Sequence, residues 1–233
     1  MRVLIADDDL VSRIAVEELF AERGDVQRVS VDSGAAAWEA VCADPRFDLL
    51  CLDVRMPAPD GITLAQQIRA TPEYEQLPIV LITSAADKET VLSATRAQVQ
   101  GFIVKPVGDE TVGRLQRLVA AFDASVLEPA RTAMQRLGVD PDRYAKYVDA
   151  LVLQLRGLVA GAQGLGQGGD VAAFQHKCGV CRNGAAALGA RRVEQLLADA
   201  GREAASHPER SAVMVLLASY WLERVLAERG RVA

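Results

Sequence analysis

The first half of the chain alternates short apolar runs with segments of helical periodicity. The apolar runs are residues 2–6, 26–33, 47–54, 78–84 and 101–107, and the amphipathic segments between and after them are residues 10–24, 33–45, 60–70, 87–98 and 109–122. Five strands alternating with five helices predict an α/β fold, a doubly wound five-stranded parallel sheet with right-handed crossovers. The run FDLLCLDV at 47–54 is almost wholly apolar, which is typical of a central strand buried on both faces.

The second half shows only helical patterning. We expect a helix over 125–138 that ends at Gly138, and a long helix over 141–162 that is capped by Asp140 and begins with proline. The glycine-rich stretch 164–169 predicts a loop. Further helices are expected over 171–189, where Asp170 is the cap, and over 189–206 and 211–230. Helices joined by short loops predict an antiparallel helical bundle.

Composition supports two domains and a cytoplasmic protein. The chain has 233 residues, half of them apolar, and we place the domain boundary between residues 123 and 124. No stretch reaches the roughly 18–20 apolar residues that a membrane span needs, and the acidic N-terminus is unlike a signal peptide. We therefore expect a cytoplasmic protein that does not bind membranes, with its four cysteines reduced.

Charge is distributed unevenly between the two halves. Residues 1–123 contain 12 Lys and Arg against 20 Asp and Glu, a net of −8, and residues 124–233 contain 14 against 11, a net of +3. A basic half raises the possibility of nucleic-acid binding, but its arginines are scattered, as on a solvated face. A nucleic-acid-binding output therefore stays open only as a disfavoured alternative.

Polar side chains follow the predicted strands at one edge of the sheet. Strand 1 ends in Asp7-Asp8-Asp9, strand 3 in Asp53, strand 4 in Thr83-Ser84 and strand 5 in Lys105-Pro106. Functional groups in such sheets gather outside the carboxyl ends of the strands. Crowded carboxylates repel one another unless a cation intervenes, and hard oxygen ligands at an open, hydrated site suit Mg²⁺.

This constellation suits phosphoryl transfer. Asp53, on the buried central strand, is best placed as the nucleophile, while Asp7 and Asp8 hold the metal, Lys105 pairs with an arriving phosphoryl oxygen and Thr83 hydrogen-bonds another. The alternative interpretation is that the three aspartates cap the first helix and Lys105 is an ordinary surface lysine. It explains each residue alone but not the agreement of four strand ends.

Residues 1–123 resemble the receiver domain of two-component response regulators. The resemblance rests on LIADDD, on DVRMPAPDG around Asp53, on ITS at Thr83 and on FIVKP around Lys105. It implies that Asp53 becomes an aspartyl-phosphate, taken from a phosphohistidine of a histidine kinase or phosphotransfer protein with Mg²⁺ bound. It further implies that the Arg55 carbonyl joins Asp7, Asp8 and Asp53 as a metal ligand and that the Lys105–Pro106 bond is cis. Such a protein is a phosphoacceptor, with self-catalysed phosphoryl transfer and slow autodephosphorylation, and not an enzyme in the usual sense.

Three positions depart from the family pattern. Ser84 replaces the usual alanine, and Phe102 occupies the switch position, paired with Thr83, that often holds tyrosine. Arg55 places a long cation beside the pocket, where it either pairs with Asp53 or Asp8 or alters the attack of water on the phosphate.

Residues 124–233 resemble a histidine-phosphotransfer (Hpt) domain, which is a helical bundle. The resemblance rests on LGVDPDRY at 137–144, on the helix order and on Leu-Gly-Ala at 188–190. The family motif His-x-Leu-Lys-Gly, aligned from either side, puts the phosphohistidine position at Gly179, the lysine position at Arg182 and the glycine position at Asn183. The resemblance implies the architecture, but the residue that carries the activity is missing.

The stretch HKCGVCRNGAAALGA at 176–190 therefore has three interpretations. His176 lies one helical turn before the expected position and would need a different docking pose to carry phosphate. His176, Cys178 and Cys181 offer metal ligands, with His207 as a fourth, but lack the second paired motif of structural zinc sites. We favour a protein-interaction face formed by His176, Gly179, Arg182 and Asn183, whose partner is a kinase, another receiver or a second copy of the chain. The main alternative is a relay that passes phosphate between Asp53 and His176.

Overall fold

The computed structural model describes residues 1–21, 26–84 and 95–230 and divides into two compact units, Met1–Ala120 and Ala121–Ala233. The division falls inside one helix, α5 (Asp109–Val126), in which the boundary expected between 123 and 124 also lies. Within the described ranges no helix is both long and apolar enough to cross a membrane.

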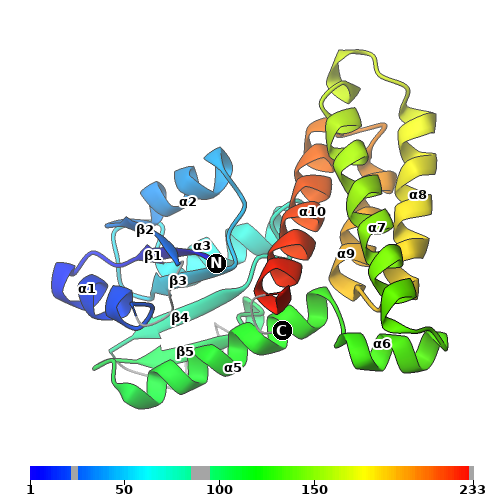
Figure 1. Cartoon of the computed structure of the whole chain (residues 1–233). Helices are drawn as coiled ribbons and strands as arrows, with labels where there is room; N and C mark the ends of the chain where they lie inside the picture. The colour runs from blue at the N-terminus through cyan, green and yellow to red at the C-terminus, as the bar shows by residue number, and fades with distance from the viewer. Residues whose placement is uncertain (22–25, 85–94, 231–233) are drawn as a thin grey trace. The chain divides into compact units, whose positions relative to one another are not determined.

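The first unit is built on a five-stranded parallel sheet, as predicted. Its strands are β1 (Arg2–Ala6), β2 (Gln27–Val31), β3 (Leu49–Asp53), β4 (Ile79–Thr83) and β5 (Gly101–Val104). They pair in the order β2-β1-β3-β4-β5, so β3 is the central strand (Figure 1). Every residue of β3 and β4 is buried, which is why these strands read as unbroken apolar runs.

Three helices follow the first three strands, and each begins at a side-chain cap. They are α1 (Leu10–Glu18), α2 (Gly34–Ala43) and α3 (Gly61–Ala70). Their caps Asp9, Ser33 and Asp60 accept hydrogen bonds from backbone N–H groups in the first turn. α1 ends before the expected Gly24, which lies outside the described residues, as does most of the helix expected over 87–98. The early end of α1 accompanies the burial of Phe20, which packs into the core just after the helix.

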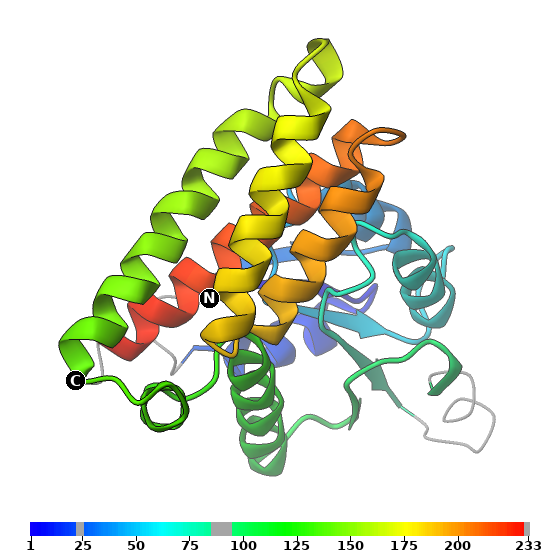
Figure 2. The ribbon, with the colours of Figure 1, turned by 90° about the vertical axis from the view of Figure 1, so that its right-hand side faces the viewer.

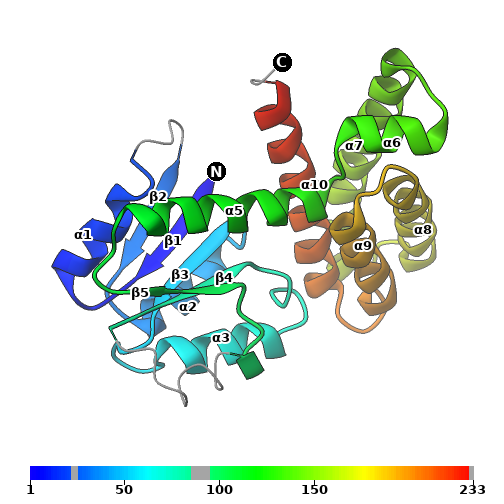
Figure 3. The ribbon, with the colours of Figure 1, turned by 90° about the horizontal axis from the view of Figure 1, so that it is seen from below.

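The sheet separates two apolar layers. Alternate strand residues, such as Val3 and Ile5 of β1, join Val16 of α1 and Leu115 and Val119 of α5 in one core. Figure 3 shows α1 and α5 on this side of the sheet. The remaining strand side chains are buried toward the other face, where the buried positions of α2 and α3 lie.

The second unit is an all-helical bundle. Its helices are α6 (Ala130–Leu137), α7 (Pro141–Ala162), α8 (Val171–Ala187), α9 (Arg191–Glu203) and α10 (Pro208–Gly230). α7 packs on α8, α8 on α9, α9 on α10 and α10 on α7, so the four long helices close a ring. Figure 2 shows them running alternately up and down, as expected of an antiparallel bundle. Asp140 and Asp170 cap α7 and α8 as predicted.

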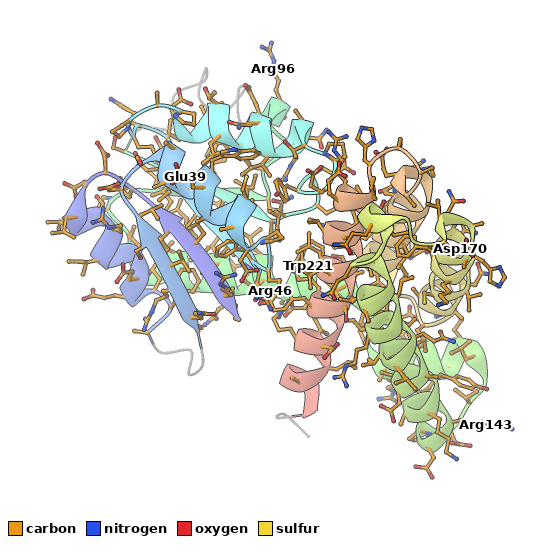
Figure 4. All side chains as sticks on the ribbon, turned by 90° about the horizontal axis from the view of Figure 1, so that it is seen from above. Glu39, Arg46, Arg96, Arg143, Asp170 and Trp221 are labelled. Atoms are coloured by element: carbon orange, nitrogen blue, oxygen red, sulfur yellow. The ribbon has the colours of Figure 1, made fainter. Side chains whose placement is uncertain are left out.

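The last turns of α5 belong to the bundle interior. The Phe122 ring meets the fully buried Trp221 of α10 edge-on at 5.0 Å, and the Arg192 guanidinium lies 4.6 Å from the centre of the same ring (Trp221 is labelled in Figure 4). Asp123 forms an ion pair with Arg224 of α10, and Ser125 accepts a 2.6 Å hydrogen bond from Arg192. These contacts tie the end of α5 to α9 and α10.

The single helix expected over 125–138 is wrong at its start. α5 continues to Val126, and α6 begins only at Ala130, after Pro129, whose backbone is extended. Proline disfavours helical geometry in the residue before it, so the chain breaks there and begins a new helix. The end at Gly138 is as predicted, because Gly138 adopts the left-handed conformation of a helix C-terminus with φ of 65°.

Candidate functional site

The carboxyl ends of four neighbouring strands bring the predicted site residues to one edge of the sheet. Asp7 follows β1, Asp53 is the last residue of β3, Thr83 is the last of β4, and Lys105 follows β5. Parallel pairing aligns these ends, with Ala6 opposite Leu52, Asp53 opposite Ile82 and Thr83 opposite Val104. Asp7, Asp53 and Thr83 are buried at the sheet edge, and Asp8 is exposed.

Lys105 joins two of the carboxylates. Its Nζ lies 2.6 Å from Oδ1 of Asp53 and 2.8 Å from Oδ2 of Asp7. The backbone N–H of Lys105 donates to the Thr83 carbonyl at 2.8 Å, which fixes the start of this side chain against β4. The Lys105–Pro106 peptide bond that follows is cis, as the family resemblance implied.

Backbone amides hold the other carboxylate oxygens. The N–H of Arg55 donates to Asp53 Oδ2 at 2.8 Å, and the N–H of Asp9 donates to Asp7 Oδ1 at 3.0 Å. One carboxylate oxygen of Asp53 thus forms an ion pair with Lys105, and the other accepts a hydrogen bond from a backbone amide. This arrangement fixes the orientation of the carboxylate.

The electrostatics of the pair follow from burial and mutual contact. Burial raises the pKa of Asp53 above its ordinary value; hydrogen bonding to Lys105 opposes this shift and the charge of Asp7 adds to it. Burial by itself would lower the pKa of Lys105, but hydrogen bonds and charge attraction to Asp53 and Asp7 outweigh it, and the pKa is raised. Lys105 therefore stays a cation, and Asp53 is a more basic carboxylate than an exposed aspartate.

The three acidic side chains fit a hard divalent cation. Asp7, Asp8 and Asp53 each offer a carboxylate oxygen, and these oxygens lie within 4.8 Å of one another. In the described part of the chain this is the one group of acidic, histidine or cysteine side chains so arranged. The donors are all hard oxygens and one of the residues is exposed, which suits a hydrated Mg²⁺.

Arg55 contributes its backbone rather than its side chain. The side chain is exposed, and among the described residues its guanidinium forms no ion pair with a carboxylate. Of the two roles considered for this side chain, pairing with Asp53 or Asp8 is therefore not present in this structure, and an effect on the attack of water stays a prediction. Phe102, the expected switch residue, lies half-buried on β5 and lines a cavity of about 600 Å³ with Val104, Arg114 and Arg117.

Sequence reasoning missed two contacts that shape the site. Arg13 of α1 donates from Nη1 to the Asp7 carbonyl at 2.6 Å. Gly61, the first residue of α3, packs so closely on the end of β3 that a Cβ there would lie 2.1 Å from the Asp53 carbonyl oxygen. The Asp-Gly pair at 60–61 could have predicted the second contact. Glycine is unfavourable inside a helix, so a glycine directly after a helix cap suggests that another segment packs closely there. Arg13 leaves no comparable trace in the sequence.

Six of the bundle residues singled out from the sequence lie on α8, whereas His207, the suggested fourth metal ligand, directly precedes α10. His176, Arg182 and Asn183 are exposed, and a Cβ added to Gly179 would meet no atom within 4 Å. Cys178 and Cys181 face the bundle interior, where burial raises the pKa of both thiols. Because the cysteines point inward and His176 is exposed, the three side chains do not form a metal site.

Comparison with known proteins agrees with the geometry of the first unit. Residues 3–116 match the model of the family described as response regulator receiver domain. Over 106 residues the chain is 36% identical to chemotaxis protein CheY-3 of Vibrio cholerae, which covers 46% of this chain and 81% of that protein. Chemotaxis protein CheY1 of Helicobacter pylori is 30% identical over the same length, with coverage of 46% and 86%. The chain belongs to the response regulator receiver family.

Solved receiver structures are also similar to the first unit. A putative response regulator from Chloroflexus aurantiacus is 28% identical, with a TM-score of 0.48, and the match covers 51% of this chain and 97% of that chain. Receiver domains interact with histidine kinases or phosphotransfer proteins and bind Mg²⁺ in their acidic pocket. The receiver match ends at residue 116 and does not extend into the helical bundle.

Proposed function

We propose that Asp53 is the phosphoacceptor of a two-component phosphorelay. The observation that carries this proposal is that both oxygens of the Asp53 carboxylate are bound, one by Lys105 Nζ at 2.6 Å and the other by the Arg55 amide at 2.8 Å. A fixed, basic carboxylate beside a permanent cation is the arrangement that an oxygen nucleophile needs for attack on a phosphoryl group.

The transfer begins with a phosphohistidine of a kinase or phosphotransfer protein. A carboxylate oxygen of Asp53 attacks phosphorus, the phosphorus–nitrogen bond breaks, and its electron pair stays on the imidazole, which takes up a proton. Lys105 follows the charge from the free carboxylate to the phosphoryl oxygens, and the Thr83 hydroxyl hydrogen-bonds another of them. Asp7, Asp8, Asp53 and the Arg55 carbonyl would hold Mg²⁺, which supplies positive charge for the phosphoryl oxygens.

Beyond this self-catalysed transfer and slow hydrolysis of the aspartyl-phosphate, the protein performs no catalysis on a separate substrate. Phosphorylation draws Thr83 and Phe102 inward and changes the surface that this unit presents to its partners. The neighbouring cavity that Phe102 lines gives its ring room to move.

The chain should take up phosphate from a small acyl phosphate, such as acetyl phosphate, in the presence of Mg²⁺. The product should be stable in acid and labile in base, as an acyl phosphate is. Asp53→Asn should remove it, while Asp140→Asn, which changes only the cap of α7, should leave it. Uptake that survives in Asp53→Asn would place the phosphate elsewhere and contradict the proposal.

We further propose that the bundle is a protein-interaction output built like an Hpt domain without its histidine. The support is the surface of α8. No Asp or Glu occurs between Asp170 and Glu194, and the exposed face carries His176, Lys177 and Arg182 around the open position at Gly179. A carboxylate-free, mildly cationic face complements an acidic surface, such as the strand-end edge of a receiver.

The bundle surface yields a gain-of-function test. Gly179→His places an imidazole where nothing lies within 4 Å of the new Cβ. If the Hpt alignment is right, the variant should acquire an acid-labile, base-stable phosphate from a phosphorylated receiver, and the parent chain should not. Asn183→His, on the same exposed face, is the matched control. Acquisition of such phosphate by the parent chain, lost in His176→Ala, would instead establish the relay, which the exposure of His176 keeps open as the second candidate.

A further inference from the structure

The first residue of α2 lies directly against the loop that leaves the acceptor strand. This loop, residues 54–60, joins β3 to α3 and is called here the acceptor loop. The N–H of Gly34 donates to the Pro57 carbonyl of the loop at 3.3 Å. A Cβ built on Gly34 would lie 1.8 Å from the carbonyl oxygen of Pro59 and 2.9 Å from its carbonyl carbon.

Space, not backbone conformation, requires the glycine at this position. Gly34 is absent from the described glycines with positive φ, so alanine could adopt its backbone angles without strain. The atoms in the way are backbone atoms of Pro59, which cannot rotate aside as the end of a side chain could. To restore even a 3.0 Å contact, the two segments would have to separate by about 1.2 Å.

The acceptor loop is the part that would move. α2 is held in place by its Ser33 cap and by Ala37 and Val41, which are fully buried. In the loop, Pro57 and Ala58 are exposed and Met56 alone is buried. A displacement of the loop therefore costs less than a displacement of the helix.

The same loop carries the amide that orients the acceptor. Arg55, its second residue, donates its N–H to Asp53 Oδ2 at 2.8 Å. At its far end the loop is anchored by Gly61, which packs on the Asp53 carbonyl. Two glycines from different helices thus enclose a seven-residue segment whose first turn holds the carboxylate.

We propose that Gly34 is a positioning residue for the phosphoacceptor: the N-terminus of α2 fixes the acceptor loop and, through it, the Arg55 amide on Asp53. Its effect on phosphorylation rests on the proposed role of Asp53, whereas its effect on the Arg55 amide does not. Gly34 touches no reacting atom, so its influence passes entirely through the loop.

The test compares Gly34→Ala with Gly157→Ala in the full chain. Gly157 is also helical, in α7, but a Cβ there would meet no atom within 4 Å. The first measurement is the chemical shift and hydrogen exchange of the Arg55 amide by NMR. The second is the rate of Mg²⁺-dependent phosphorylation by acetyl phosphate, measured well below each variant's Tm so that the folded protein alone is compared.

Gly34→Ala should shift the Arg55 amide, speed its exchange and slow phosphorylation by about tenfold or more, because a displacement of about 1 Å can cost up to about a hundredfold. Gly157→Ala should change neither. An unchanged Arg55 amide in folded Gly34→Ala overturns the inference. If the parent chain takes up no phosphate, the proposed function fails, and the amide measurement still decides the role of Gly34.

A second variant covers the case in which Gly34→Ala does not fold. Ser33→Ala removes the side-chain cap that fixes the same helix terminus and adds no atom next to the loop. It should shift the Arg55 amide in the same sense by a smaller amount. No shift in this variant would contradict the proposal.

Discussion

The ammonium nitrogen of Lys105 lies 2.6 Å from Oδ1 of Asp53, although a whole strand, β4, separates the strands that carry them. The lysine reaches across because its backbone is fixed to the end of β4, and its side chain then lies along the edge of the sheet. Its contact with Asp7, one strand further on, spans three sheet positions in all. The positive charge of the site therefore comes from the end of β5, whereas its carboxylates come from the ends of β1 and β3.

Removing this charge should impair phosphoryl uptake. We expect Lys105→Met to slow phosphorylation by acetyl phosphate on the order of a hundredfold, the usual effect of losing one preorganised electrostatic contact in a transition state. Arg96→Ala is the control, since Arg96 is an exposed cation of the same unit and projects outward (Figure 4). Equal rates for Lys105→Met and the parent would show that the lysine does not act on the phosphoryl group.

Gly61 should tolerate no side chain. Its Cβ would come within 2.1 Å of the Asp53 carbonyl oxygen, so Gly61→Ala should lower the free energy of unfolding by about 1–3 kcal/mol, as overpacking does. Gly157→Ala, in open space on α7, should raise it by about 0.5–1 kcal/mol through helix propensity. Urea unfolding curves of both variants test this, and a stabilised Gly61→Ala would mean that the close approach is not real.

Two ion pairs on α10 should differ in their contribution to stability. Arg224, with 6% of its side chain exposed, pairs with Asp123, whereas Arg156, with 63% exposed, pairs with Glu223. Arg224→Met should cost about 3 kcal/mol, because it leaves Asp123 without its partner in a largely buried place. Arg156→Met should cost much less, because its pair with Glu223 is exposed to solvent. Denaturation of the two variants at low and high salt measures both effects, and equal losses would contradict the assignment of Arg224 to the interior.

The reactivity of the cysteine thiols should depend on their burial. Burial raises the pKa of Cys51 and of Cys178 from an ordinary 9.0 to about 12. Partial burial raises the pKa of Cys42 as well, but Cys42 is exposed and a reagent can reach it. Since the thiolate is the reactive form, a disulfide reagent at pH 8 should modify Cys42 first and these two only as fast as the chain opens. Rapid modification of Cys178 in the folded protein would place it at the surface.

The same shift sets a pH window for stability. A thiol whose pKa is raised on folding stabilises the native state fully below pH 9, and this contribution is lost as pH rises from about 9 toward about 12, because the unfolded state ionises first. The double variant Cys51→Ala, Cys178→Ala should therefore lose stability less steeply than the parent between pH 9 and 11. Parallel unfolding midpoints across this range would exclude the effect.

Most of the sheet unit could be predicted because its signals are local. The apolar runs of β3 and β4 and the caps Asp60 and Ser33 are short-range patterns that fix element type and position. The meeting of Asp53 with Lys105 followed from the alignment of parallel strand ends, which topology alone dictates. The early end of α1 was missed because the apolar pattern continues through Phe20, whereas the backbone turns more tightly there: Phe20 donates its N–H to the Glu17 carbonyl and Ala21 to the Glu18 carbonyl, each three residues back.

The details of the site were less accessible than its location. The side chain of Arg55 is exposed, and its backbone amide is the group that contacts Asp53. The residue type alone does not predict this. Gly34 and Pro59 are 25 residues apart in the sequence, and they come close only because Gly34 has no side chain. A sequence pattern does not show which distant segment a glycine will contact. In the bundle, Pro129 could have predicted a helix boundary. The apolar spacing on both sides of it fits one continuous helix, which is why a single helix was predicted over 125–138.

The placement of Phe122 between Trp221 and Arg192 bears on how the two halves are best produced separately. A clone that starts at residue 124 would leave behind the aromatic partner of the bundle's only fully enclosed tryptophan in the described part of the chain, and the acidic partner of Arg224 with it. A clone that starts at residue 121 keeps both. Recombinant material for binding studies on the bundle should therefore begin there.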